Sequence, residues 1–258
     1  MDLNRHMQVA TASAYKAARI LQSYFGNNPR VRKKDAVEIV TEADTKSEKE
    51  IIRTIQGRFP EHEILGEEGG LMEGSAEYRW VIDPLDGTVN FAHRIPIFSI
   101  SIALTFRGDI VLGIVLNPMD GELFSAVRGQ GAQLNGRPIR VSTAQSVSDS
   151  LLVTGFPYDI RRAFEPIMAR YGNCLKAAQA VRRLGSAALD LCYVACGRFE
   201  AFWEQYLKPW DTAAGVLIAA EAGARVTTFA DKPYTLDDQE ILASNGHIHN
   251  EMLRLLKL

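Results

Sequence analysis

The amino-acid sequence predicts an α/β protein with an α+β N-terminal half, residues 1–142, and an α/β C-terminal half, residues 143–258. Two patterns lead to this prediction. Short strand-like segments separated by turn signals fill residues 97–134 and indicate an antiparallel meander. Beyond about residue 141, strand-like and helix-like segments alternate, which is typical of α/β folds. We therefore expect two layered halves with a cleft between them.

The N-terminal half begins with two amphipathic helices. Apolar residues spaced three and four apart predict the first helix over residues 3–25, and a second helix that runs to about residue 58. Short strands at 64–66 and 78–82 follow, and each ends at carboxylate residues. The strands predicted for the meander are 97–106, 110–116, 122–127 and 132–134.

The C-terminal half contains no repeat, low-complexity tract or flexible linker. Its predicted strands cover residues 151–156, 199–203, 224–229 and 241–243. Its predicted helices start near residue 162, cover 187–195 and 212–222, and follow residue 246. These patterns predict the elements without fixing the order of the strands in a sheet.

The composition argues against several classes of protein. The 29 basic residues nearly balance the 31 acidic ones, so nothing indicates the broad charged surface that binds nucleic acid or anionic membranes. The apolar runs are far too short to span a bilayer, and the N-terminus lacks the apolar block of a signal peptide. Three cysteines without a CxxC spacing indicate neither a disulfide framework nor a zinc site. A cytoplasmic protein is the expectation.

The most specific motif is DPLDGT at residues 83–88, where an apolar strand gives way to a turn and then to a helix. Asp83 and Asp86 can point into one cleft from the end of the strand, while Gly87 lets the backbone approach a ligand. The amides of Gly87 and Thr88 would begin the helix, a position that favours phosphate. Asp, Pro and Gly are also ordinary turn residues, so the motif alone has a purely structural interpretation as well.

Further acidic residues stand at the ends of predicted elements, namely Asp44, the pair Glu67 and Glu68, and Asp211. Two carboxylates ~4 Å apart repel by about 4 kcal/mol at an effective dielectric of ~20. Divalent cations remove this repulsion, and a set of oxygen ligands without His or Cys suits Mg²⁺. Water bound to such an ion is a nucleophile at neutral pH. The acidic groups therefore predict a magnesium site.

Three motifs, GEE at 66–68, DPLDGT at 83–88 and WDTAAG at 210–215, resemble in order and separation the signature motifs of the inositol monophosphatase family. The likeness continues through VTEAD at 40–44 and GSAALD at 185–190, so it extends over nearly the whole chain. It implies a layered αβαβα sandwich of the sugar-phosphatase type, usually a homodimer, dependent on Mg²⁺ and commonly inhibited by Li⁺. The implied reaction is hydrolysis of a small phosphorylated polyol or sugar such as myo-inositol monophosphate, with release of inorganic phosphate.

The resemblance also assigns residues to roles. Two or three Mg²⁺ ions per subunit would be held by Glu67, Asp83, Leu85 through its carbonyl, Asp86, Asp211 and, through water, Asp44. Thr88 and Asp44, together with Glu67, would orient and deprotonate the attacking water. The residues assigned to the substrate are Asp86, Gly87, Thr88, Arg182, Gly185, Ala187, Glu204 and Asp211. Lys33 and Lys34 lie in the segment that forms a metal-associated loop in the family; in isolation they form a solvated basic run.

Two departures from the family pattern concern the substrate. Val89 replaces a common threonine, and Tyr206 stands where relatives often carry glycine, which would reshape the polyol rim. A bisphosphatase acting on fructose 1,6-bisphosphate or adenosine 3′,5′-bisphosphate at the same site is the first alternative. A regulatory binding protein that keeps the fold is the second. The spacing of Asp83 and Asp86 does not match the Asp-x-Asp pair of haloacid-dehalogenase phosphatases.

Overall fold

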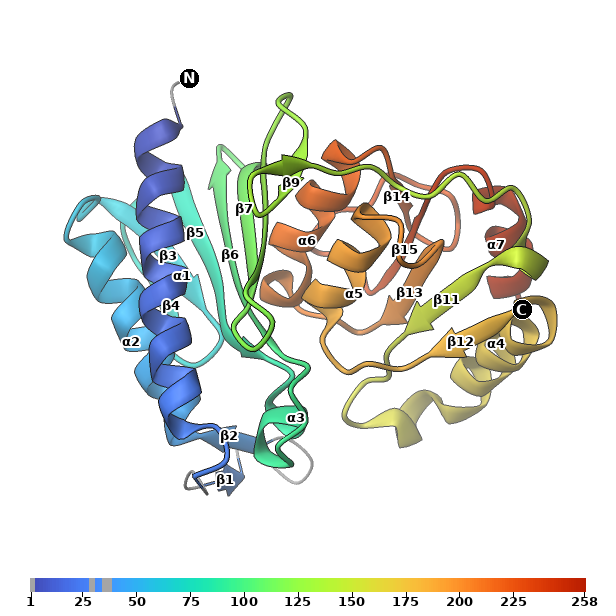
Figure 1. Ribbon diagram of the computed structural model, residues 1–258, viewed down its shortest axis with the longest axis horizontal. Coiled ribbons are helices and arrows are strands. Elements are labelled where there is room, and N and C mark those ends of the chain that lie inside the picture. Colours follow the sequence, from blue (N-terminus) through green and yellow to red (C-terminus); the bar gives the residue numbers. More distant parts are fainter. Residues whose placement is uncertain (1–2, 28–30, 34–38) are drawn as a thin grey trace.

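The computed structural model describes residues 3–27, 31–33 and 39–258 (Figure 1). Its helices are α1 (Asn4–Tyr24), α2 (Glu42–Gln56), α3 (Thr88–Ala92), α4 (Phe164–Ala177), α5 (Ala187–Ala195), α6 (Pro209–Glu221) and α7 (His249–Leu256). The strands up to the meander are β1 (Val31–Lys33), β2 (Ile39–Thr41), β3 (His62–Gly66), β4 (Gly70–Met72) and β5 (Ser75–Asp86). The meander contains β6 (Ser99–Phe106), β7 (Asp109–Asn117), β8 (Glu122–Val127), β9 (Ala132–Leu134) and β10 (Arg137–Pro138). The later strands are β11 (Leu151–Thr154), β12 (Ala180–Arg182), β13 (Ala201–Gln205), β14 (Arg225–Thr227) and β15 (Glu240–Ser244).

Helices and sheets alternate in five layers, as Figure 1 shows. The α1–α2 pair covers the outer face of an eight-stranded sheet, and α5 and α6 separate this sheet from a five-stranded one. The far face of the five-stranded sheet carries α4 and α7. The layered αβαβα sandwich predicted from the sequence is therefore confirmed.

The two sheets differ in their pairing. In the larger sheet the order is β10-β9-β8-β7-β6-β5-β3-β4, with β6 to β10 forming the predicted antiparallel meander and β3 lying parallel to β5. In the smaller sheet the order is β12-β11-β13-β15-β14, and β11 runs parallel to both of its neighbours. The carboxyl ends of β3 and β5 in one sheet and of β11 to β13 in the other lead into the same cavity.

Apolar clusters fill the spaces between the layers. Leu21 of α1 and Ile55 of α2 pack with residues of the larger sheet, whereas Ile218 of α6 packs with residues of its other face. Leu191 of α5 and Phe202 of β13 belong to the next cluster. Because α6 lies between other elements and contacts the larger sheet along much of its length, its sequence is apolar around most of the helix rather than along one stripe.

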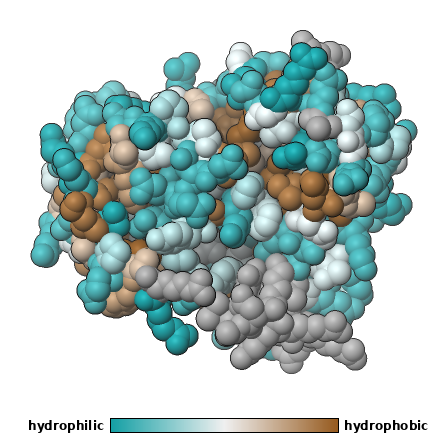
Figure 2. Space-filling model, turned by 180° about the vertical axis from the view of Figure 1, so that it is seen from behind, coloured by the Kyte–Doolittle hydropathy of each residue, from teal (hydrophilic) through white to brown (hydrophobic). Residues whose placement is uncertain are grey.

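The surface carries mostly hydrophilic residues on the face seen in Figure 2, with small apolar groups between them. Within the described part of the chain, no helix combines the length and the apolar character needed to cross a membrane.

Several boundaries differ from the sequence-based prediction for local reasons. The second helix begins at Glu42 because Thr41 and Asp44 form a capping box, in which each side chain pairs with the other residue's backbone amide. Helix α6 begins at Pro209, a residue that is favoured in the first helical turn. The short strands β4 and β12 were not predicted, because three-residue strands with exposed or half-buried side chains carry little apolar signal.

Candidate active site

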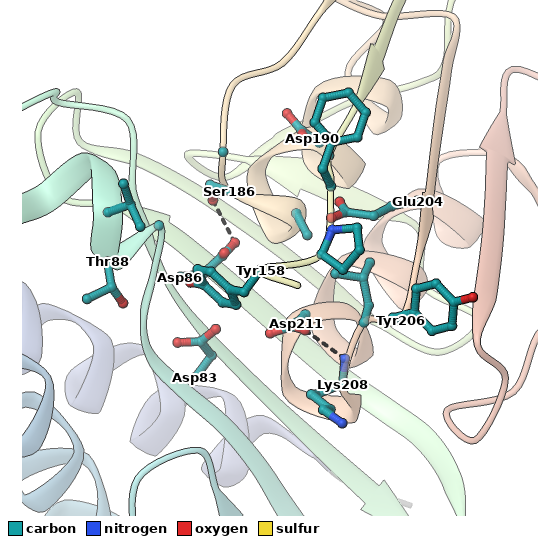
Figure 3. Close-up of a pocket in the computed structure, with 18 of the residues that line it drawn as sticks. Asp83, Asp86, Thr88, Tyr158, Ser186, Asp190, Glu204, Tyr206, Lys208 and Asp211 are labelled. Atoms are coloured by element: carbon teal, nitrogen blue, oxygen red, sulfur yellow. Dashed lines mark hydrogen bonds between the residues drawn. The ribbon is translucent and has the colours of Figure 1, made fainter. Parts of the chain in front are cut away.

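A cavity of about 190 Å³ opens between the two sheets. Its walls come from the segments that follow β3, β5, β11, β12 and β13, and from the first turns of α3, α5 and α6. Glu67, Asp83, Asp86 and Asp211 all line this cavity, so residues separated by more than a hundred positions in the sequence meet there. Figure 3 shows the three aspartates on facing elements.

The DPLDGT turn is held in a fixed shape by its own hydrogen bonds. Asp83 Oδ1 accepts a hydrogen bond of 2.9 Å from the amide of Leu85, and the hydroxyl of Ser47 on α2 donates to the carbonyl of Pro84 at 2.9 Å. Gly87 adopts a left-handed conformation with φ of 101°, and a side chain here would meet the Gly185 carbonyl at 3.1 Å. The turn thus brings the β5 carboxylates and the start of α3 to the cavity.

Asp44 and Thr88 form a buried pair. The Thr88 hydroxyl lies 3.1 Å from Asp44 Oδ1 and 3.1 Å from the Leu85 carbonyl, so both oxygens compete for its proton. The other carboxylate oxygen, Oδ2, accepts hydrogen bonds from the amide and hydroxyl of Thr41. Burial raises the pKa of Asp44 to about 6, and the hydrogen bonds from Thr41 oppose the rise. Asp44 therefore serves both as a helix cap and as an acceptor directed at Thr88.

Asp86 is held by the start of α5. Its Oδ2 accepts hydrogen bonds from the Ser186 hydroxyl at 2.6 Å and from the Ala188 amide at 2.8 Å. Ser186 is also the N-cap of α5, since its side chain accepts a hydrogen bond from the Leu189 amide. Ser186 was not among the residues predicted for the site, although a serine before a helical segment is a recognisable cap signal.

Asp211 is fixed in the first turn of α6. Its Oδ2 accepts a hydrogen bond of 2.7 Å from the backbone amide of Lys208 (Figure 3). The Ser101 hydroxyl of β6 donates to the Trp210 carbonyl at 3.2 Å and ties this turn to the larger sheet. Asp211 thus reaches the cavity from α6, the helix that packs between the two sheets.

The carboxylates of the cavity repel one another. Burial raises the pKa of Asp83 well above its ordinary value, and the charges of Glu67 and Asp86 raise it further. Burial also raises the pKa of Asp86 to about 6, although the hydrogen bond from Ser186 opposes the rise. The pKa of Asp211 is raised by burial first and by Asp86 second. A cation placed between these groups would relieve the repulsion.

Within residues 3–27, 31–33 and 39–258, no three His, Cys, Asp or Glu side chains converge as a ready-made metal site. The carboxylates of Asp83, Asp86 and Asp211 share one cavity, and each accepts a hydrogen bond from the protein. Their chemistry fits a hard cation, since every side chain offered is a carboxylate. The acidic side chains that line the cavity are therefore the groups that could hold such a cation.

The structure corrects the expectation for Arg182. This residue ends β12 with its side chain exposed, and it does not line the cavity, whereas Arg183 does. Successive side chains in an extended segment point to opposite faces, so a shift of one residue exchanges the two arginines. The Arg183 guanidinium lies beside Gly185, where an added Cβ atom would meet it at 2.5 Å.

The remaining residues assigned to the substrate line the cavity, namely Gly87, Thr88, Gly185, Ala187 and Glu204. Glu204 at the end of β13 is buried, and burial raises its pKa to about 8. Gly155 makes room for it, because a side chain at Gly155 would collide with the Glu204 carboxylate. Lys34 lies outside the described residues, and Lys33 ends β1.

Tyr158 and Tyr206 line the mouth of the cavity. Burial raises the pKa of Tyr158, and the charges of Glu67 and Asp86, which line the same cavity, raise it further. Sequence analysis did not identify Tyr158; the Gly155 and Pro157 that follow β11 were the available turn signal. Tyr206 has φ of 66°, in the left-handed region that favours glycine.

Comparison with known proteins settles the family. The chain matches the inositol monophosphatase family over residues 2–257. The chain belongs to this family. It is 42% identical to a protein of Synechocystis named inositol-1-monophosphatase, over 99% of the chain and 90% of the relative. It is 40% identical to a protein of Escherichia coli named Nus factor SuhB, over 96% of the chain and 94% of the relative.

Solved structures of the inositol monophosphatase family share this fold. The extragenic suppressor protein suhB from Bartonella henselae superposes with a TM-score of 0.95 at 39% identity, covering 98% of this chain and 99% of that one. The inositol monophosphatase from Anabaena superposes with a TM-score of 0.91 at 42% identity, covering 99% and 96%. The family and these relatives support a phosphatase function, as the sequence predicted.

Proposed function

We propose that the chain is a Mg²⁺-dependent phosphomonoester hydrolase that releases inorganic phosphate from myo-inositol monophosphate. The observation that carries the proposal is the pairing of Thr88 with Asp44 beside the acidic group of the same cavity, with Thr88 Oγ1 3.1 Å from Asp44 Oδ1. This arrangement provides an activated hydroxyl, a proton acceptor and a cluster of oxygen ligands at one place.

The proposed metal ligands are Glu67, Asp83, Leu85 through its carbonyl, Asp86, Asp211 and, through water, Asp44. We propose two or three Mg²⁺ ions per subunit, since the mutual repulsion of Asp83, Asp86 and Asp211 favours more than one positive charge. When bound, Mg²⁺ would lower the pKa of water and neutralise charge on the phosphoryl oxygens. The hydrogen bonds of Asp86 and Asp211 to α5 and α6 keep these side chains at the cavity wall before binding.

The proton of the attacking water is proposed to leave through Thr88. The hydroxyl of Thr88 points at Asp44 Oδ1, so its oxygen lone pairs are available to accept a proton while its own proton passes to Asp44. Thr41 holds the opposite edge of Asp44, which fixes the direction of Oδ1. Glu67 is proposed to help position the water, and the amides of Gly87 and Thr88 to hold phosphate oxygens. Water then attacks phosphorus directly, without a phosphoenzyme.

The alcohol part of the substrate is proposed to lie toward Glu204, Gly185 and Ala187, on the side formed by the smaller sheet. Burial raises the pKa of Glu204 to about 8 and the charge of Arg183 opposes the rise, and its carboxyl group can pair with substrate hydroxyls in either protonation state. This assignment makes a polyol monoester the favoured substrate, and a sugar or nucleotide bisphosphate the alternative for the same site.

The decisive experiment is phosphate release with Mg²⁺ from inositol 1-phosphate, fructose 1,6-bisphosphate and adenosine 3′,5′-bisphosphate in parallel. We expect preference for the inositol ester, and loss of activity on Asp83→Asn. Asp149→Asn, which changes an exposed carboxylate outside the cavity, is the matched control and should retain activity. Preference for a bisphosphate would keep the reaction and change the substrate, whereas no release from any ester would remove the proposal.

A regulatory role is the second candidate, because several curated relatives are named Nus factor SuhB. A macromolecular partner that is captured equally by the wild-type chain and by Asp83→Asn would support a role separate from catalysis.

From the sequence we further propose a cytoplasmic homodimer that is sensitive to Li⁺. Light scattering of the purified protein and inhibition of phosphate release by millimolar Li⁺ test the two molecular properties directly. A monomer by light scattering, or unchanged phosphate release in Li⁺, would remove the corresponding property.

A further inference from the structure

Asp190 is a buried carboxylate that the catalytic scheme above does not use. It lies in the first turn of α5, it is 1% exposed, and it lines the same cavity as Glu204. Neither of its carboxylate oxygens has a hydrogen-bond partner among the residues that the structure describes. Asp86 and Asp211 each accept a hydrogen bond from a backbone amide, whereas Asp190 accepts none.

An unpartnered buried carboxyl group destabilises a protein, whether it is charged or neutral. A buried carboxyl retained at such a cost points to a partner that enters the cavity from outside the chain. The position in α5 does not itself require a polar side chain, since Leu189, Leu191 and Cys192 around it are buried apolar residues. A hydrocarbon side chain at position 190 would suit the helix better.

The surroundings of Asp190 restrict the kind of partner. Burial raises the pKa of Asp190, the charges of Glu204 and Asp86 raise it further, and the charge of Arg183 lowers it. Asp190 lines the cavity together with these two carboxylates and this guanidinium. Figure 3 shows Asp190 and Glu204 together on one side of the cavity, and Asp83 on the other. The metal-binding side and the Asp190 side are thus different parts of one cavity.

We propose that Asp190 recognises hydroxyl groups of the alcohol part of the substrate, and that with Glu204 it selects polyol esters over esters of alcohols without further hydroxyls. This inference rests on the proposed phosphatase function. A hydroxyl group is the fitting partner because it is neutral and both donates and accepts, so it can pair with a carboxyl group in either protonation state. A cationic group would meet the guanidinium of Arg183, which already occupies this side.

The test compares two esters that share a six-membered ring. Inositol 1-phosphate carries the additional hydroxyls, and cyclohexyl phosphate carries none. We expect Asp190→Leu to lower kcat/KM for inositol 1-phosphate by about 10- to 100-fold, mainly through a higher KM, because the hydrogen bonds between its carboxyl group and the substrate hydroxyls are lost. For cyclohexyl phosphate, kcat/KM should change by less than about threefold. If cyclohexyl phosphate is bound without being hydrolysed, its inhibition constant replaces kcat/KM in the comparison.

A second measurement separates recognition from a structural role. The melting temperature of Asp190→Leu should equal or exceed that of the wild type, because the substitution removes a buried polar group that has no partner. Asp190→Asn keeps the shape and two polar atoms, so its loss on inositol 1-phosphate should be smaller than that of Asp190→Leu. Asp149→Leu, which alters an exposed carboxylate outside the cavity, is the control for both esters.

The inference is overturned by an equal loss on both esters, by no loss on either, or by a lowered melting temperature of Asp190→Leu with unchanged selectivity. Its failure is distinct from that of the proposed function. If the wild-type chain released phosphate from no ester, the proposed function would fail first, whereas selective activity that is insensitive to Asp190 would remove the inference alone.

Discussion

The hydroxyl of Ser186 donates a hydrogen bond of 2.6 Å to Asp86 Oδ2, and this contact joins the start of α5 to the end of β5. The two residues are 100 positions apart in the chain. Ser186 also accepts the amide of Leu189 as N-cap, and Ser99 lies 3.2 Å away on β6. One serine therefore positions an acidic side chain of the cavity and begins a helix between the two sheets.

Replacement of this serine tests both roles. Ser186→Ala should lower kcat/KM by about 10-fold or more and cost roughly 1–2 kcal/mol of unfolding free energy, because it removes a hydrogen bond to a carboxylate and a helix cap. Ser186→Thr keeps the hydroxyl and should retain more of both. Steady-state kinetics and urea unfolding measure the two effects. A loss of stability without a change in kinetics would show that Ser186 acts as a cap only.

The Asp44–Thr88 pair should control turnover rather than binding. Thr88→Val and Asp44→Asn are expected to lower kcat about 10²- to 10⁴-fold with little change in KM, because they remove proton acceptance while nearly preserving the size of each side chain. Thr88→Ser retains the hydroxyl and should recover most of the rate. If Thr88→Val were as active as Thr88→Ser, the proposed route for the proton would be wrong.

Added Mg²⁺ should stabilise the protein more at pH 8 than at pH 5. Burial and mutual repulsion raise the pKa values of Asp83 and Asp211, and that of Asp86 to about 6, so each group costs stability as the pH rises through its folded-state pKa. In a chelator the melting temperature should therefore fall between pH 5 and pH 8. Magnesium at about 100 times its dissociation constant should add about 2.7 kcal/mol to the free energy of unfolding, which corresponds to a melting temperature higher by roughly 5–10 °C.

Asp83→Asn removes one of the repelling charges, so it should raise the melting temperature in chelator and reduce the increase that Mg²⁺ causes. If Mg²⁺ raised the melting temperature of Asp83→Asn as much as that of the wild type, Asp83 would not belong to the metal site.

Those parts of the candidate site that one continuous segment forms could be predicted from the sequence. The helix over 187–195 and the turn at 83–88 follow from apolar spacing and turn residues, and both are present in the structure. Contacts between distant segments left no local signal. The bond from Ser186 to Asp86 depends on how α5 packs between the sheets. The choice between Arg182 and Arg183 depends on the phase of a strand too short to be predicted.

A buried histidine far from the cavity gives the stability a second pH dependence. His249 accepts from the Ser244 hydroxyl at Nδ1, 2.8 Å away, and its Nε2 lies 2.9 Å from the Thr227 hydroxyl. The Thr227 hydroxyl also lies 2.8 Å from the Thr228 carbonyl and donates to it, so Nε2 carries the proton that faces Thr227. Both ring nitrogens are therefore used by the neutral form, and burial lowers the pKa of His249 to about 4.

Because the folded pKa of His249 lies below the unfolded value, this stability is fully present above about pH 6.5 and is lost as the pH falls toward 4. The expected loss is on the order of 2–3 kcal/mol. Urea unfolding at pH 7 and pH 4.5 should give this loss as the difference between the wild type and His249→Gln, because the cavity carboxylates, whose effect on stability has the opposite sign, are the same in both proteins. His247→Gln, an exposed neighbour, is the control. If the free energy of unfolding changed equally between the two pH values in His249→Gln and in the wild type, groups other than His249 would cause the acid sensitivity.

Tyr206 tests how the rim of the cavity is built. Its φ of 66° strains any residue with a Cβ atom, and its side chain is 45% exposed at the mouth of the cavity. Tyr206→Ala removes the ring and keeps the backbone strain, whereas Tyr206→Gly removes both. Tyr206→Gly should therefore be more stable than Tyr206→Ala by roughly 1 kcal/mol.

The same two variants test whether the ring shapes the rim. If it does, both should raise one ratio by the same factor, namely kcat/KM for fructose 1,6-bisphosphate divided by kcat/KM for inositol 1-phosphate. A shift confined to Tyr206→Gly would instead assign substrate choice to the backbone at this position, because only that variant relaxes it.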